Sequence, residues 1–239
     1  MGQIRLYIAQ PLSVDQKIEL DERQSHYLTN VMKLKIGDSV HCFDNQNGEF
    51  GCEIAEITKK HCILQVTSHD KPYHLPPDIW LLFAPVKKDN TDFILQKATE
   101  LGARKIIPVM TRYTISERIK KERFIAQTIE AAEQCRRVDL PEITEMVSFD
   151  NLLKSWPLER KLYYLDETLK GKPAKRAFTA DEQCAILVGP EGGFSQQELE
   201  TLRNTIFAQG VTLGPRILRA ETAAIAALAC WQALKGDWQ

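Results

Sequence analysis

Two glycine-proline turns, each directly after an apolar run, have the residue types most suited to binding a ligand. The first turn, 189–193 (GPEGG), follows the apolar run 185–188, and the second, 214–215 (GP), follows 211–213. Glycine in such a turn accepts positive φ and lets a ligand approach the backbone closely. A glycine-rich turn between a strand and a helix often cradles a phosphate, so the first question is which ligand these turns would bind.

The charge of Glu191 argues against a phosphate and for a ligand with a positive centre. A carboxylate next to a phosphate in a partly dry site repels it by several kcal/mol. The chain also lacks the Gly-x-Gly-x-x-Gly and P-loop patterns, which disfavours a nucleotide-binding α/β enzyme. A plain connection between strand and helix is the other interpretation, with Ser195 as the helix cap and Glu198 completing a capping box. This turn alone leaves both interpretations open.

The second turn leads into two arginines and an alanine-rich stretch. Arg216 and Arg219 come directly before it, and the five alanines between 223 and 229 allow another backbone to pack closely. Glu221 stands in the first turn of the expected helix. There it orients an arginine, acts as a base, or only stabilises the helix dipole. Tight packing beside two arginines and a Gly-Pro turn favours a binding site over a merely packed helix.

Alternating apolar runs and amphipathic stretches predict a parallel sheet covered by helices for residues 75–239. The expected strands are 79–84, 105–110, 161–165, 185–188 and 211–213, and the expected helices include 92–101, ended by Gly102, and 117–136. In open sheets of this kind, ligands bind beyond the carboxyl ends of the strands. Both glycine turns and the segment Asp166-Glu167 follow such ends. We therefore expect the site there.

Residues 1–70 have the short alternating stretches and frequent turns of a compact β-barrel. The expected strands are 4–8, 16–20, 39–43, 49–57 and 62–68, and residues 22–31 are expected to be helical. Residues 68–78 contain three prolines and are the predicted linker between the two domains.

The composition restricts the partners and the location. The net charge of −1 excludes a basic field over the whole protein, so contact with nucleic acid requires a local patch. No apolar run approaches the roughly 20 residues that span a bilayer, and the first residues lack a signal-peptide core, so we expect a cytoplasmic protein without a membrane partner. The His-Cys pairs at 41–42 and 61–62 have spacings typical of strands, where neighbours point to opposite faces. The cysteines are therefore expected to be buried apolar residues, without metal or disulfide.

Four segments together resemble the bacterial 16S ribosomal RNA (uracil-N3)-methyltransferase family. They are GPEGGFSQQEL (189–199), LGPRILRAETAAIAAL (213–228), FILQKATELGARKIIPV (93–109) and EAAEQCRR (130–137). The family belongs to the SPOUT class of enzymes that use S-adenosylmethionine, and the resemblance covers nearly the whole chain. It implies an α/β SPOUT-type parallel sheet with a deep trefoil knot, an N-terminal PUA-like β-barrel that binds RNA, and a homodimer with the alanine-rich helix at its interface.

The resemblance also implies the function and the residues of the site. The enzyme would methylate N3 of a uridine in the 16S rRNA of the small ribosomal subunit. The cofactor-binding residues that it implies are Leu165, Val188, Gly189, Pro190, Gly193, Leu213, Gly214, Ile217, Leu218, Arg219 and Ala223. Arg219 is the first candidate, and Arg216 the second, for stabilising the uridine anion that forms when N3 loses its proton, and Glu221 is the third predicted catalytic residue. The predicted RNA-binding residues are Arg5, Arg23, Arg112 and Arg136.

The chain departs from the family pattern at two places. Lys33, in Val31-Met32-Lys33, stands where family members often have arginine, so a guanidinium fork becomes a point charge. Residues 87–90 lack a glycine that often follows the first strand of the α/β domain. Two alternatives stay open: an enzyme of the same class acting on a tRNA or a ribose 2′-hydroxyl, and a non-catalytic PUA-type RNA-binding protein.

Overall fold

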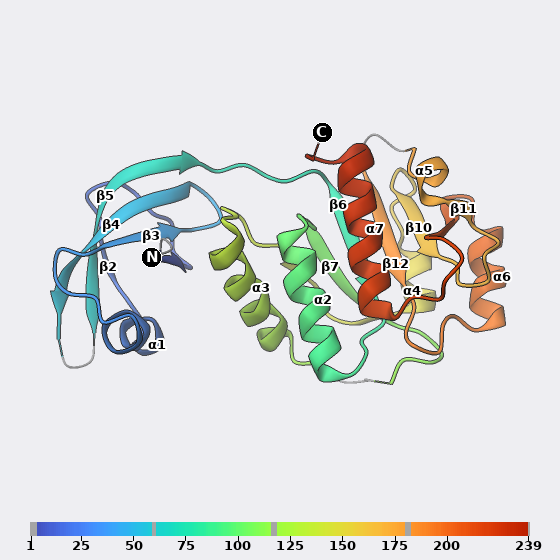
Figure 1. The fold of residues 1–239 in the computed structure, drawn as a ribbon, viewed down its shortest axis with the longest axis horizontal. Coiled ribbons are helices and arrows are strands. Elements are labelled where there is room, and N and C mark those ends of the chain that lie inside the picture. Colours follow the sequence, from blue (N-terminus) through green and yellow to red (C-terminus); the bar gives the residue numbers. More distant parts are fainter. Residues whose placement is uncertain (1–3, 59–60, 116–118, 180–182, 239) are drawn as a thin grey trace. The chain divides into compact units, whose positions relative to one another are not determined.

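The computed structural model describes residues 4–58, 61–115, 119–179 and 183–238 (Figure 1). The chain divides into two compact units. The N-terminal unit consists of Met1–Leu75 and Ala132–Leu140, and the C-terminal unit of Pro76–Ala131 and Pro141–Gln239. The segment Ala132–Leu140 therefore packs with residues more than 60 positions away in the sequence.

The N-terminal unit is a five-stranded sheet around its own core. The strands lie in the order β1 (Arg5–Tyr7), β3 (Ser39–Phe43), β4 (Gly48–Ile57), β5 (Cys62–Pro72) and β2 (Lys17–Glu19), and only β1 and β3 pair in parallel. Helix α1 (Glu22–His26) continues into a π-helical turn at Tyr27–Val31. Alternate strand residues, including Cys42, Cys52 and Cys62, are buried in one cluster. This confirms the expected strands, the helical stretch and the buried cysteines.

Strand β5 is longer than predicted. The proline-containing segment after residue 68 was expected to be a linker, but β5 continues to Pro72. Its last residues pair with the beginning of β4, and Lys71 Nζ lies 2.6 Å from Glu49 Oε1 while His69 stacks on Phe50. The predicted linker is thus wrong for residues 68–72, because cross-strand pairs outweigh the weak local strand signal.

Arg5 is buried, with 5% of its surface exposed, and its guanidinium is used inside the N-terminal unit. The group pairs with the carboxylate of Glu49 and donates hydrogen bonds of 2.7 Å to the carbonyl oxygens of Ala132 and Arg137. These bonds hold the segment Ala132–Leu140 against β1. The RNA contact predicted for Arg5 does not fit this burial, because the donors that would bind a phosphate already have partners.

We expect replacement of Arg5 by alanine to lower the free energy of unfolding by about 3 kcal/mol, because Glu49 would stay buried with Lys71 as its remaining charged partner and the carbonyl oxygens of Ala132 and Arg137 would lose their donor. The measurement is urea denaturation of the full chain. Arg23→Ala is the control, since Arg23 is exposed on α1 and its loss should change stability by less than about 0.5 kcal/mol. Equal stability of both variants would contradict a structural role for Arg5.

The C-terminal unit is built on one parallel sheet. Its strands lie in the order β11 (Lys172–Pro173), β13 (Ala208–Thr212), β10 (Lys161–Leu165), β12 (Cys184–Val188), β6 (Ile79–Phe83), β7 (Lys105–Met110) and β8 (Glu142–Ile143), with β9 (Val147–Ser148) also beside β7. Every ladder among these strands is parallel, as predicted. Strand β13 begins three residues before the predicted run, because Ala208 pairs with Leu162 although residues 208–210 are not strongly apolar.

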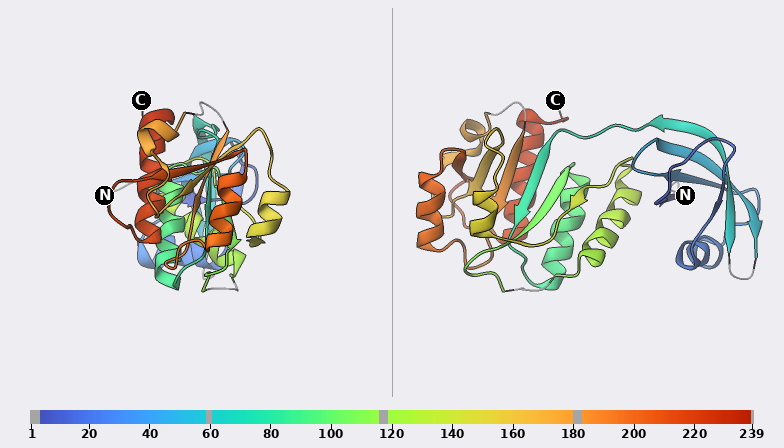
Figure 2. Two further views of the ribbon diagram at one scale, coloured as in Figure 1. Left: turned by 90° about the vertical axis from the view of Figure 1, so that its right-hand side faces the viewer. Right: turned by 180° about the vertical axis from the view of Figure 1, so that it is seen from behind.

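Helices cover both faces of this sheet (Figure 2, left). Helices α2 (Lys88–Glu100), α3 (Lys121–Cys135), α5 (Ala174–Ala177) and α7 (Ala220–Lys235) pack on one face, and α4 (Phe149–Lys154) and α6 (Gln196–Asn204) on the other. In β12, Ile186 belongs to the first core cluster and its neighbour Leu187 to the second. Burial on both faces explains why the strands are continuous apolar runs.

Two helix boundaries differ from the sequence prediction. Helix α2 begins at Lys88, four residues earlier than expected, and ends before Gly102, whose φ of +77° confirms the predicted C-terminal glycine. Helix α3 begins at Lys121. The predicted beginning of that helix, residue 117, lies outside the described residues.

Candidate active site

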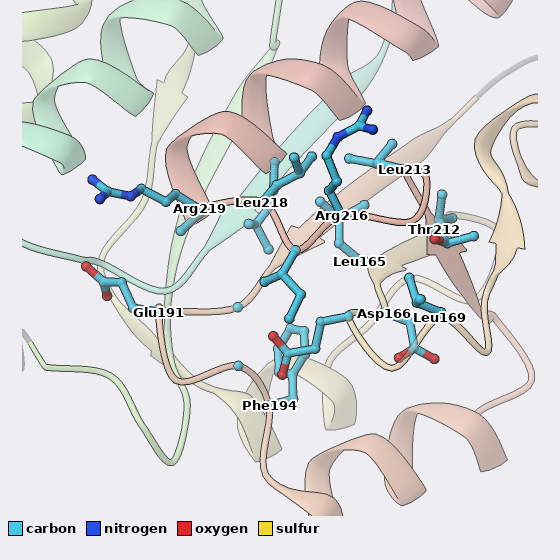
Figure 3. Close-up of a pocket in the computed structure, with 18 of the residues that line it drawn as sticks. Leu165, Asp166, Leu169, Glu191, Phe194, Thr212, Leu213, Arg216, Leu218 and Arg219 are labelled. Atoms are coloured by element: carbon cyan, nitrogen blue, oxygen red, sulfur yellow. The ribbon is translucent and has the colours of Figure 1, made fainter.

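Three loops at the carboxyl ends of neighbouring strands surround one pocket of about 220 Å³ (Figure 3). The loops follow β10, β12 and β13, which are adjacent in the sheet, and the first turn of α7 closes the pocket. All eleven residues predicted to hold a cofactor line it: Leu165, Val188, Gly189, Pro190, Gly193, Leu213, Gly214, Ile217, Leu218, Arg219 and Ala223. Residues from three separate loops thus meet at one place in the fold.

Eight further residues line the pocket without being among the predicted cofactor-binding or catalytic residues. They are Asp166, Glu167, Leu169, Glu191, Phe194, Val211, Thr212 and Ala220. Asp166 and Glu167 come directly after a strand that was correctly predicted, so their position at the end of β10 is the signal that identifies them. Phe194 was missed because its ring packs beneath Gly189, a contact that depends on the turn geometry.

The first glycine loop is both a tight turn and a helix start. Gly193 has a φ of +68°, and its N–H donates to the Pro190 carbonyl oxygen at 2.9 Å. Ser195 then caps α6: its N–H donates to Glu198 Oε2 at 2.8 Å, and the Glu198 N–H donates to Ser195 Oγ at 3.2 Å. The predicted capping box is confirmed. It coexists with the pocket, because the box uses the polar end of the loop and leaves Gly189 and Gly193 lining the cavity.

Glu198 also joins two loops of the site. Its second oxygen, Oε1, accepts the backbone N–H of Arg112 at 2.8 Å, and the residue is only 8% exposed. Tyr113 lies against Gly192, so the loop after β7 packs on the glycine loop. The Arg112 side chain is exposed and lines a second, more polar pocket together with Met110, Phe149, Asp150, Gln197 and Thr201.

The two predicted catalytic arginines lie on the loop between β13 and α7. Arg216 and Arg219 line the pocket, are exposed, and form no ion pair within the described part of the chain. Arg219 is the residue before α7, and its side chain makes no capping hydrogen bond. Figure 3 shows Arg219 and Glu191 on the same side of the pocket and Arg216 pointing away from that side. Both guanidinium groups are therefore available to a ligand.

Glu221 does not line the pocket. Ala220 and Ala223 face the cavity from the first turn of α7, and successive helical residues point about 100° apart, so Glu221 is turned away. Its Oε2 is buried without a hydrogen-bond partner among the described residues. The catalytic role predicted for Glu221 does not fit this placement.

Two adjacent carboxylates line the pocket, and they differ in their hydrogen-bond partners. Asp166 is 4% exposed, and its Oδ1 accepts from the Thr168 N–H at 2.9 Å and the Thr168 hydroxyl at 2.6 Å. Arg203 lies 3.5 Å from the other oxygen. Glu167 accepts no hydrogen bond from the described residues. Glu167 is exposed, but partial burial of its carboxyl, and then the neighbouring Asp166 charge, raises its pKa.

The remaining predicted RNA contacts lie on exposed positions. Arg23 is exposed on α1, and Arg136 is exposed just after α3 with a φ of +65°. Lys33, which replaces an arginine of the family pattern, is also exposed. Among the residues the structure covers, no group of three or more His, Cys, Asp or Glu side chains is placed to hold a metal ion. None of the helices in the described ranges of the chain is long and apolar enough to cross a membrane.

The unit with the parallel α/β sheet and its pocket, and the separate small β unit, are those of an RNA methyltransferase with a PUA domain. The family model described as "RNA methyltransferase domain" matches residues 74–232, and the model described as "RNA methyltransferase PUA domain" matches residues 20–67. Ribosomal RNA small subunit methyltransferase E from Rickettsia conorii is 33% identical, covering 94% of this chain and 93% of that protein. The Bacillus subtilis protein of the same name is 32% identical, covering 89% of this chain and 90% of that protein.

Solved structures agree with these relatives. A ribosomal RNA small subunit methyltransferase E from Neisseria gonorrhoeae bound to S-adenosyl methionine superimposes with a TM-score of 0.91 and 28% identity over the whole of both chains. A Legionella pneumophila methyltransferase in complex with the same cofactor has a TM-score of 0.90 and 30% identity, covering 99% of this chain and all of that one. The chain belongs to the ribosomal RNA small subunit methyltransferase E family, which confirms the resemblance seen in the sequence.

Proposed function

We propose that this protein transfers the methyl group of S-adenosylmethionine to N3 of one uridine in the 16S rRNA of the small ribosomal subunit. The observation that carries the proposal is the pocket in which three strand ends bring together all eleven residues predicted for the cofactor. The names of the relatives support the RNA, and the cofactor in two similar structures supports the methyl donor.

The pocket residues fit this methyl donor chemically. Gly189, Gly193 and Gly214 leave backbone groups accessible to an adenine edge or a ribose, and Leu165 and Leu218 offer apolar surface to the ring. The three carboxylates of Asp166, Glu167 and Glu191 outnumber the two arginines of the lining, a balance that favours a sulfonium over a phosphate. When bound, the cofactor supplies the reactive methyl group, while the protein supplies position and electrostatics.

Arg219 is proposed to stabilise the uridine anion. Uridine N3 becomes a nucleophile only after it loses its proton, and the negative charge then spreads onto the neighbouring carbonyl oxygens. A guanidinium placed at those oxygens lowers the energy of the anion. Arg219 is exposed at the pocket and free of an ion pair within the described chain, so it is the first candidate, and Arg216 is the second.

RNA binding is proposed to extend beyond the pocket. The N-terminal unit, predicted as 1–70, would hold the RNA through exposed residues such as Arg23, while Arg112 and Arg136 would contact phosphates. The match of residues 20–67 to a PUA domain of RNA methyltransferases supports this. The remaining part, predicted as 75–239, would carry the chemistry, with the trefoil knot that the resemblance implies.

A homodimer in the cytoplasm completes the proposal. The side of α7 that is not packed on the sheet carries Thr222, Ile225, Ala226 and Ala229, a surface of small and apolar side chains suited to a second copy of the chain. Light scattering of the purified protein measures the molar mass. A monomer at all concentrations would contradict this part of the proposal.

Methyl transfer to ribosomal particles tests the function. Small subunits and free 16S rRNA from cells that lack the native activity are incubated with the protein and labelled S-adenosylmethionine, and the product is digested and identified by nucleoside mass spectrometry. We expect 3-methyluridine in the 16S rRNA. A methylated tRNA or ribose 2′-hydroxyl would support the other enzyme of this class. Absence of both methyl transfer and calorimetric binding of the cofactor would support a non-catalytic RNA-binding protein.

A further inference from the structure

The geometry of uridine N3 restricts where its proton acceptor lies. N3 is an imide nitrogen: one electron pair is delocalised into the two flanking carbonyls, and the nucleophilic pair lies in the ring plane where the N–H bond was. The proton leaves and the methyl carbon arrives along the same edge of the base, one after the other. The proton acceptor must therefore line the pocket that holds the methyl donor, within about 3 Å of N3 or one water away.

Three carboxylates line that pocket, and two of them are poorly suited. Asp166 is buried and accepts two hydrogen bonds from Thr168, with Arg203 beside its other oxygen, so its lone pairs are largely used. Glu191 projects to the same side as Arg219 (Figure 3), where it is placed to orient that guanidinium. Glu167 is the remaining carboxylate.

We propose that Glu167 accepts the N3 proton, an inference that rests on the proposed function. The Glu167 side chain extends from the loop after β10 to the glycine loop after β12. Its Oε1 lies so close to Gly193 that a Cβ added to this glycine would be 1.7 Å from the oxygen. The carboxylate makes no hydrogen bond within the described chain, so its lone pairs are free for a substrate proton. Gly193 thus has a second role besides its positive φ: it leaves room for the acceptor.

The step balances without a further reactant. The N3–H bond breaks, the proton moves to a Glu167 oxygen, and the electron pair stays on N3. N3 then forms a bond to the methyl carbon while the carbon–sulfur bond breaks and its electron pair returns to sulfur, giving a neutral thioether. Water takes the proton from Glu167 after the product leaves.

The surroundings of Glu167 make it a better base than an ordinary carboxylate. Partial burial of the Glu167 carboxyl and the Asp166 charge raise its pKa, and a pKa nearer to neutrality improves proton abstraction. The other charged groups of the loops and helices around it are Glu191, Arg203, Arg216 and Arg219. The ionised form is active, so the rate of methyl transfer rises with pH through the raised pKa of Glu167.

Glu167→Gln tests the inference in the full-length protein with saturating S-adenosylmethionine and the RNA that the wild type methylates. We expect kcat to fall about 100-fold, the rising limb of the pH profile to disappear, and the calorimetric Kd for the cofactor to stay unchanged. Gly193→Ala, which displaces the carboxylate without removing it, should also lower kcat. Glu200→Gln is the matched control, because Glu200 is exposed on α6 outside the pocket.

Two results would overturn the role of Glu167. One is a Glu167→Gln variant that has the kcat of the wild type and keeps the rising limb of the pH profile. The other is a variant with a weaker cofactor Kd and an unchanged kcat, which would make Glu167 a cofactor contact. Failure of the proposed function looks different, because the wild type itself would then produce no 3-methyluridine in the same assay.

Discussion

Replacement of Arg219 by alanine is expected to lower kcat for methyl transfer by about 100- to 1,000-fold, the usual cost of removing one donor that stabilises a developing negative charge. Arg219 lines the pocket at the residue before α7 and forms no ion pair within the described chain. Its charge is therefore not compensated inside the protein. The effect should appear in kcat at saturating RNA, because the uridine anion exists only after the proton has left.

Three comparisons separate this role from other effects. Arg219→Lys keeps the charge but loses the planar fork, so it should restore only part of the rate. Arg176→Ala removes an exposed arginine of α5 that does not line the pocket, and its kcat should equal that of the wild type. Thermal unfolding should be the same for the wild type and the alanine variants, since Arg219 is exposed and makes no cap bond. A change in KM alone after Arg219→Ala would make Arg219 an RNA contact and not a catalytic residue.

The sequence predicts most of the C-terminal unit because its signals are local. Strands such as 161–165 and 105–110 are apolar runs that both faces of a parallel sheet require, and their observed bounds agree with the prediction. The capping box between Ser195 and Glu198 depends on residues three positions apart, and it forms as expected. Strand ends in such a sheet meet at one edge, which is why residues from three loops line one pocket.

Errors arise where a residue's role depends on a distant segment. Arg5 has the appearance of a surface cation in the sequence, but the carbonyl groups of Ala132 and Arg137, more than 120 residues away, surround it in the fold. The extension of β5 to Pro72 depends on pairing with β4 rather than on its own residues. Glu221 is only one position from Ala220, and the helical rotation alone removes it from the pocket.

The same rotation makes Ala223 part of the pocket wall, and replacing this alanine by leucine is expected to weaken cofactor binding at least about 100-fold, or about 2.8 kcal/mol. Ala223 is 9% exposed and lines a pocket of about 220 Å³, so the larger side chain would occupy space that the proposed cofactor needs. A close-packed wall cannot move aside at small cost. Calorimetry with S-adenosylmethionine measures the loss directly, without RNA.

Ala233→Leu supplies the matched control, because Ala233 is exposed on the same helix and lies outside the pocket. Light scattering must show an unchanged molar mass, since Ala233 lies one helical turn beyond Ala229 on the surface proposed for the second copy. Its cofactor affinity should equal that of the wild type. Ala223→Gly removes volume from the wall, so it should keep the affinity although it costs the helix about 1 kcal/mol. If Ala223→Leu bound the cofactor as well as Ala233→Leu does, the cofactor would lie elsewhere. The assignment of all eleven predicted cofactor-binding residues would then fail together, because they share this one cavity.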